Sequence, residues 1–252
     1  MRIKKVSGKR LGSVAALLAA TGSGIALAAS PASAHEVGKE AWTYRSDTGA
    51  CHLTRSYVLP TNGNGGAFAE GEAFTGANGP CGEWEIQEPG NITARILYLK
   101  RQGPFWGICR DTGFLFNPDH YFSFAVRLED FSEPPCGAGT YGSVAITAHW
   151  KGWFWKGGPV WSGEHTFPET IHTARKSSAN PTWVDGNGNV DTAALPDQIP
   201  VLDENGQISG YTDAERAMST PSLSPADAAA KARTQGGKIV RGENGIVVEI
   251  GR

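Results

Sequence analysis

Between residues 40 and 168 the chain alternates short stretches of β-forming residues with glycine, proline and asparagine, and this punctuation constrains the fold most strongly. Eight or nine such stretches can be counted. In the stretch at 91–103, alternation places four apolar side chains on one side of an extended strand: Ile92, Ala94, Ile96 and Tyr98. Many short strands separated by turns are typical of a single antiparallel β-sandwich or barrel. We therefore predict a mainly β domain at 35–168.

Four cysteines lie in this region, and an even number in an exported chain favours disulfides. Three pairings are open. The second and fourth cysteines each stand in a Pro-Cys-Gly sequence and follow a partner at similar distance, which suggests a repeated unit. We therefore expect the bridges Cys51–Cys81 and Cys109–Cys136.

The N-terminus has the features of a secretory signal peptide. A basic head precedes residues 11–29, which are uncharged and rich in alanine and leucine, and Ala32-Ser33-Ala34 then provides a small-x-small cleavage site. The style of this segment resembles secretory signals of high-GC Gram-positive bacteria. We expect cleavage after Ala34 and an extracellular protein. A membrane anchor is the alternative, but the run is only weakly apolar for a spanning helix.

Removing residues 1–34 changes the charge balance. Five of the 23 basic residues and no acidic residues lie there, so 18 basic and 25 acidic residues remain, a formal net charge of −7. Nucleic-acid binding requires a basic face, so we expect no nucleic-acid partner.

The C-terminal part has a different composition. Residues 169–198 are polar and rich in Pro, Ser, Asn and Gly, which indicates a linker. Residues 199–252 then predict a small hairpin–helix–hairpin module that packs on the sandwich or moves on its linker. Its turns are placed at Asn205-Gly206 and Asn244-Gly245. Its helix is expected to start at Ser224-Pro225 and to end at Gly236-Gly237.

The segment at 149–165 contains four of the eight tryptophans. On a strand, Trp153 and Trp155 would share one face and Phe154 the other. The C-terminal module could cover the two tryptophans as part of a core. Alternatively, the rings stay exposed and stack against sugar rings. The predicted ligand-binding set is Trp153, Trp155, Trp161, Lys151, Lys156 and Glu164.

Metal and catalytic sites have weaker support. Cleavage after Ala34 would make His35 the first residue, as in secreted copper-dependent polysaccharide oxygenases and small copper carriers, with a second ligand among His52, His120, His149, His165 and His172. The stretch at 185–196 begins like a calcium loop but has Val190 and Pro196 at positions that need glycine and glutamate. We expect no cofactor. Acid–base pairs are conceivable at Glu83 with Glu85 and at Asp119 with His120.

The favoured function is a secreted, non-catalytic protein that binds a carbohydrate or cell-envelope glycan. Two alternatives remain open. One is a secreted polysaccharide-active enzyme, either a hydrolase or a copper oxidoreductase. The other is an extracellular module that binds or inhibits a protein partner.

Overall fold

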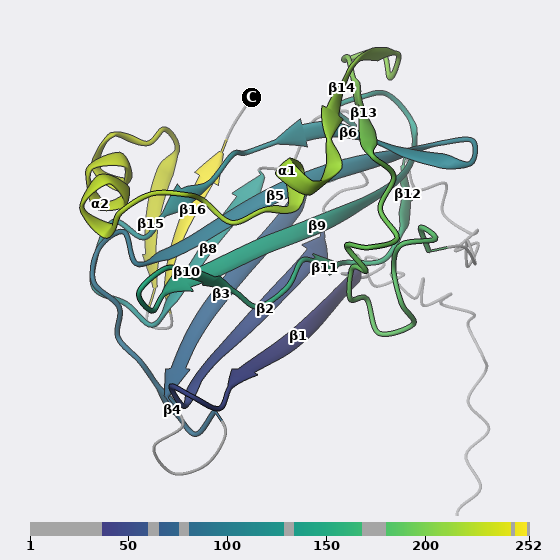
Figure 1. Cartoon of the computed structure of the whole chain (residues 1–252). Coiled ribbons are helices and arrows are strands. Elements are labelled where there is room, and N and C mark those ends of the chain that lie inside the picture. The colour runs from purple at the N-terminus through teal and green to yellow at the C-terminus, as the bar shows by residue number, and fades with distance from the viewer. Residues whose placement is uncertain are drawn as a thin grey trace, which may run out of the picture. The chain divides into compact units, whose positions relative to one another are not determined.

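The computed structural model describes residues 37–59, 66–75, 81–128, 134–167, 180–242 and 245–250. These residues form one compact unit in which two β-sheets pack face to face (Figure 1). Most strand pairs are antiparallel and the two short helices lie near the C-terminus. The predicted mainly β, sandwich-like fold is therefore confirmed.

The first sheet has the strand order β1-β2-β3-β8-β16-β15, and β4 pairs with β3. All its pairs are antiparallel except that of β16 with β8, which is parallel. The strands are β1 Val37–Arg45, β2 Ala50–Val58, β3 Ala67–Thr75, β4 Glu83–Trp84, β8 Ser123–Leu128, β15 Lys238–Gly242 and β16 Gly245–Ile250.

The second sheet has the order β10-β9-β5-β6-β13-β14, with β11 and β12 paired to β9 and β7 paired to β5. Its one parallel pair is β13 with β6. The strands are β5 Ile92–Gln102, β6 Phe105–Asp111, β7 Leu115–Phe116, β9 Gly139–Trp150, β10 Phe154–Lys156, β11 Val160–Trp161, β12 His165–Phe167, β13 Gln198–Leu202 and β14 Ile208–Asp213.

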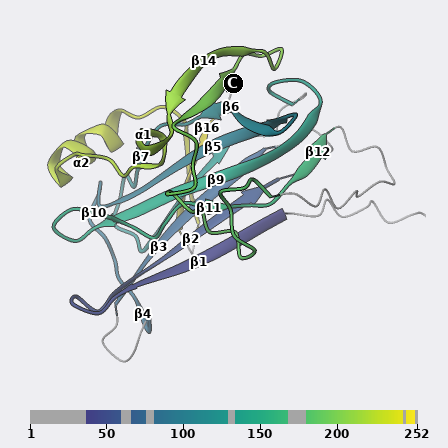
Figure 2. The ribbon, with the colours of Figure 1, turned by 45° about the vertical axis from the view of Figure 1, so that its right-hand side comes forward.

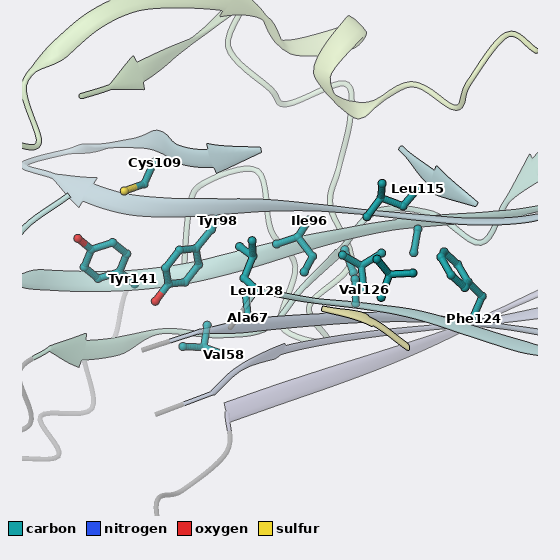
Figure 3. Packing of buried hydrophobic residues seen from close by; sticks show 14 of the residues in the cluster. Val58, Ala67, Ile96, Tyr98, Cys109, Leu115, Phe124, Val126, Leu128 and Tyr141 are labelled. Atoms are coloured by element: carbon teal, nitrogen blue, oxygen red, sulfur yellow. The ribbon is translucent and has the colours of Figure 1, made fainter. Parts of the chain in front are cut away.

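The main hydrophobic core lies between the sheets (Figure 3). Ile96 and Tyr98 of β5 contribute to it from the second sheet, and Ala67 of β3 from the first. The four alternating residues predicted to share one side of β5 all belong to this core: Ile92, Ala94, Ile96 and Tyr98. The period-2 pattern therefore identified the inner face of this strand.

Both disulfides form in the pairing that the spacing favours. Cys51 of β2 is bonded to Cys81, just before β4, and Cys109 of β6 is bonded to Cys136, before β9. Each bridge closes a loop of about 30 residues, which restricts the unfolded chain. Two disulfides indicate an oxidising environment.

The C-terminal residues are built into the sandwich. The hairpin β13–β14 joins the second sheet through β6, whereas the hairpin β15–β16 joins the first sheet through β8. The described residues of 199–252 therefore contribute strands to both sheets. Backbone hydrogen bonding over long sequence distances, which no local pattern reveals, decides this placement.

Two helices connect the hairpins. The expected helix is α2, Pro225–Thr234, with Ser224 as its N-cap. A shorter helix, α1 (Ala214–Met218), follows β14 and was not anticipated, although Asp213 caps it by accepting a hydrogen bond from the Arg216 backbone N–H. Neither helix is long and apolar enough to cross a membrane, within the residues that the structure describes.

The outer faces of the two sheets differ. Trp183, Ile199 and the α1 residue Met218 pack over the outer face of the second sheet. In both ribbon views α1 and β14 lie on that side, away from β1, β2 and β3 (Figures 1 and 2). Among the described residues, no helix packs over the outer face of β1, β2 and β3.

Candidate functional site

The outer face of the first sheet is arranged in rows that cross β1, β2 and β3. Because the strands are antiparallel and in register, side chains of the same row lie beside one another. A charged row contains Glu40, Arg55 and Glu70; a mixed row contains Trp42, Leu53 and Glu72; and an aromatic row contains Tyr44, Cys51, Phe74 and, on β4, Trp84.

Exposed aromatic rings gather at the end of this face that β4 occupies. We call Trp42, Tyr44, Phe74, Trp84 and Phe122 the aromatic face. Trp42, Tyr44 and Trp84 are 49, 50 and 61 % exposed. The Trp42 and Phe74 ring centroids lie 5.0 Å apart, and those of Phe74 and Trp84 lie 6.3 Å apart. The exposed Trp42 and Trp84 rings therefore both pack against the buried Phe74, unlike the single exposed apolar residues found on most proteins.

Trp84 is held in one orientation by its neighbours. Its ring stacks on Phe122 with centroids 4.7 Å apart. Burial raises the pKa of Glu72, and the Trp84 side chain is among the groups that lower it. The Cys51–Cys81 disulfide closes the loop just before β4. One ring face is therefore covered while the side chain stays largely exposed, which reduces the entropy lost on binding.

A cluster of charges adjoins the aromatic face. The Arg55 guanidinium donates to Glu40 (3.3 Å), to Glu70 (3.0 Å) and, in a closer contact, to Glu72. Burial raises the pKa of Glu72, and the Glu70 charge adds to this effect, whereas Arg55 opposes it. Three carboxylates thus share one cation, and the cluster has an excess of negative charge.

Trp153 lies in the turn between β9 and β10 and is 54 % exposed. The Arg45 guanidinium lies 4.4 Å from the Trp153 ring centroid, and Arg45 also forms an ion pair with Asp47. Lys151, in the same turn, forms an ion pair with Glu85, the residue after Trp84. These contacts place Trp153 and Lys151 at the same end of the sandwich as the aromatic face.

The other two tryptophans of the predicted set are not comparably exposed. Trp155 is half-buried, and its ring packs against the edges or faces of two histidines, His52 and His149. Trp161 is 1 % exposed and packs against Trp106 and Trp183. Trp161, a member of the predicted ligand-binding set, is therefore buried beneath Trp106 and Trp183.

Within the Trp153-Phe154-Trp155 sequence, the C-terminal helix α2 covers Phe154. Phe154 is buried with Phe116 against Ala228 and Ala232 of α2. Trp153, outside the strand, remains exposed. The sequence left open whether the C-terminal residues cover the Trp-Phe-Trp sequence. In the structure, α2 covers Phe154 and leaves Trp153 exposed.

The last two predicted ligand-binding residues lie in or beside short strands of the second sheet. Lys156 is half-buried in β10. The Glu164 carboxylate lies 3.9 Å from Arg101 and directly precedes β12, which pairs with the opposite end of β9 from β10. The structure therefore brings together Trp153 and Lys151 of the predicted set, and separates Glu164 from them.

Two of the histidines named as possible copper ligands, His52 and His149, are not open to a ligand. His52 and His149 lie between the sheets with their Nδ1 atoms 2.8 Å apart, hydrogen-bonded to each other and fully buried. His35 and His172 lie outside the described residues. Across the described ranges, no group of three or more His, Cys, Asp or Glu side chains is arranged to hold a metal ion.

The remaining sequence candidates are occupied by local contacts. The Asp185 carboxylate accepts hydrogen bonds from the backbone N–H groups of Asn187 and Asn189, so it closes its own turn. Exposed His120 contacts Glu88 at 2.6 Å and Asp119 at 3.6 Å. Glu85, of the Glu83–Glu85 pair, forms the ion pair with Lys151 described above.

Sequence reasoning missed the main members of the aromatic face, Trp42, Tyr44 and Trp84. The first two lie two residues apart in EAWTY, a spacing that places them on one face of a strand. That signal was present at the sequence level. The position of Trp84 beside them depends on the pairing of β3 with β4, which is not visible in the sequence.

No protein-family model, curated protein or solved structure matches this chain.

Proposed function

We propose that this protein is exported and binds a glycan, without catalysis, through the aromatic face of its first sheet. The observation that carries the proposal is the group of exposed tryptophans at one end of the sandwich, each in contact with a neighbouring side chain. A flat indole offers a large apolar surface to the C–H face of a pyranose ring. The signal-like residues 1–34 and the two disulfides support residence outside the cell.

The geometry favours a ligand over a structural role for these rings. Trp42, Trp84 and Trp153 each contact a neighbour on one side and remain about half exposed or more. A tryptophan used only for packing would be buried, as Trp161 is at the centre of its cluster. Ordered rings beside carboxylates and a guanidinium provide both stacking surfaces and hydrogen-bonding groups for sugar hydroxyls.

Calorimetric titration of the mature protein with soluble hexasaccharides tests the proposal. Trp84→Ala and Trp42→Ala are each expected to weaken binding about tenfold, because each removes one stacking surface. The matched control is Tyr211→Ala, which removes a similarly exposed ring (60 %) on β14 of the other sheet.

The control variant is expected to bind like the wild type. Loss of binding in the Tyr211 variant together with full binding in the Trp84 variant would move the ligand site to the second sheet. Failure of every neutral, acidic and amine-bearing hexasaccharide to bind would overturn glycan binding altogether.

A further inference from the structure

The charge beside the aromatic face limits the class of glycan that it can bind. Arg55 is the cation of its cluster, and it is in contact with three carboxylates, Glu40, Glu70 and Glu72. The cluster thus carries a formal charge of about −2 when all its groups are ionised. An acidic polysaccharide would approach like charges, which costs free energy and slows association.

The carboxylates and the indoles lie in neighbouring rows of the first sheet. Trp84 lies opposite Phe74, in the row next to that of Glu72. Burial raises the pKa of Glu72, and Trp84 is among the groups that lower it. Trp42 lies in the same row as Glu72, across Leu53. A ligand stacked on either ring is therefore adjacent to negative charge.

An ammonium group is attracted by both features. Aromatic faces attract cations through the ring quadrupole, most strongly in tryptophan. Carboxylates at the rim add Coulomb attraction, which is modest at an exposed site. Arg45 over the Trp153 ring shows that an indole at this end of the molecule already accommodates a cation.

We propose, resting on the glycan-binding function above, that the ligand is an amino-sugar polymer with free amines, such as a glucosamine oligosaccharide. Two exposed tryptophans with Phe74 between them offer stacking positions to separate sugar units, and the carboxylate cluster faces the amines. The N-acetylated form of the same sugar lacks the positive charge and should bind more weakly.

The test compares four hexasaccharides of matched length at low ionic strength, by calorimetric titration: glucosamine, N-acetylglucosamine, glucose and galacturonic acid. The glucosamine hexamer is expected to bind about tenfold more tightly than the N-acetylated one. This preference should shrink in high salt, because exposed charges are screened. The galacturonic acid hexamer is expected to bind weakest.

Variants identify the source of the preference. Glu40→Gln and Glu72→Gln are each expected to reduce the preference for the glucosamine hexamer over the N-acetylglucosamine hexamer about threefold. The matched control, Glu215→Gln, removes an exposed carboxylate from α1 on the other sheet and should leave the preference intact.

The outcomes separate this inference from the function on which it rests. Equal binding of the acetylated and free-amine hexamers, or tighter binding of the acidic one, overturns the charge preference while glycan binding stands. Absence of binding by all four overturns both. Circular dichroism of each variant shows whether the fold is kept, and Glu40→Gln, on an exposed strand position, is the variant least able to disturb it.

Discussion

At the residue scale, the least expected feature is a polar seam between the sheets. His52, Thr54 and Ser56 of β2 face His149, Thr147 and Ser143 of β9, all buried. Since the Nδ1 atoms of the two histidines share one proton, one ring carries its hydrogen on Nδ1 and the other on Nε2. Such hydrogen bonds fix how the two sheets align, because sliding one sheet would leave buried polar groups without partners.

The buried histidines predict an acid-sensitive fold. Burial lowers the pKa of His52 to about 3, and burial together with His52 and Lys151 lowers the pKa of His149 well below its ordinary value of 6.5. Unfolding releases rings that bind protons near pH 6.5, so below that pH the unfolded state binds more protons than the folded state. Stability is therefore full above pH 6.5 and falls towards pH 3, by about 1.4 kcal/mol per pH unit for each histidine.

Urea unfolding between pH 7 and 5, above the range in which most carboxylates titrate, measures this slope. The control is His120→Gln, which removes an exposed histidine and should retain the slope. A free energy of unfolding that stays constant between pH 6.5 and 5 would contradict the prediction.

A second prediction concerns Thr147, whose hydroxyl lies 2.6 Å from His52 Nε2 and 2.7 Å from the Thr54 hydroxyl. Thr147→Val keeps the shape and removes both hydrogen bonds, leaving two buried polar groups without this partner. We expect a loss of about 2–4 kcal/mol in the free energy of unfolding. Thr166→Val is the matched control, since Thr166 bonds Thr140 at an exposed position, and should cost under about 1 kcal/mol. Equal costs for the two variants would show that the seam does not stabilise the fold.

At the element scale, α2 packs against a glycine that precedes β5. Gly90 has a φ of 85°, and a Cβ there would lie 2.4 Å from the Ala229 backbone nitrogen. Glycine is therefore required at position 90 for two reasons: the positive φ of its backbone and the close approach of α2. The same helix covers Phe154, so the Trp-Phe-Trp sequence takes its final arrangement from a distant element.

Substitution separates the two requirements. Gly90→Ala is expected to destabilise the protein by about 3 kcal/mol or more, because it combines the cost of a positive φ with displacement of α2. Gly103→Ala is the control, with a φ of 59° and no atom within 4 Å of the new Cβ, and should cost about 1–2 kcal/mol. Thermal unfolding compares the two, and indistinguishable losses would show that α2 yields without cost.

Helices and hairpin turns with strong local sequence signals could be predicted, whereas the strands with which they pair or pack could not. Ser224 and Pro225 specify the start of α2 through capping and a fixed φ, which are interactions within a few residues. The α1 helix, with five residues, has too few turns to produce a periodic signal. Asn205-Gly206 marks the first hairpin, but the pairing of β13 with β6 depends on residues almost one hundred positions away.

At the scale of the whole molecule, the candidate site combines residues that local sequence patterns indicate with residues that only the fold brings together. The tryptophan-rich segment includes Trp153, which is exposed because it lies in a local turn. Trp161 has similar neighbours in sequence yet lies beneath Trp183, which arrives from the C-terminal part of the chain. The aromatic face required knowledge of sheet order, because β1 and β4 approach each other only through β2 and β3.

The two C-terminal hairpins predict that the molecule unfolds as one unit. Ile246 and Val248 of β16 belong to the same buried cluster as Phe124 and Val126 of β8, and Leu202 of β13 completes this cluster from the other sheet. Removing either hairpin would expose apolar surface of the shared cluster, so we expect neither part to be stable alone. We expect a single urea transition in which tryptophan fluorescence, circular dichroism and hydrogen exchange of β15–β16 share one midpoint with the disulfides intact. A chain truncated after Gly237 should show a clearly lower urea midpoint of unfolding or fail to fold. If instead the C-terminal residues unfold first and leave the midpoint of the remaining strands unchanged, the C-terminal residues do not stabilise the sandwich.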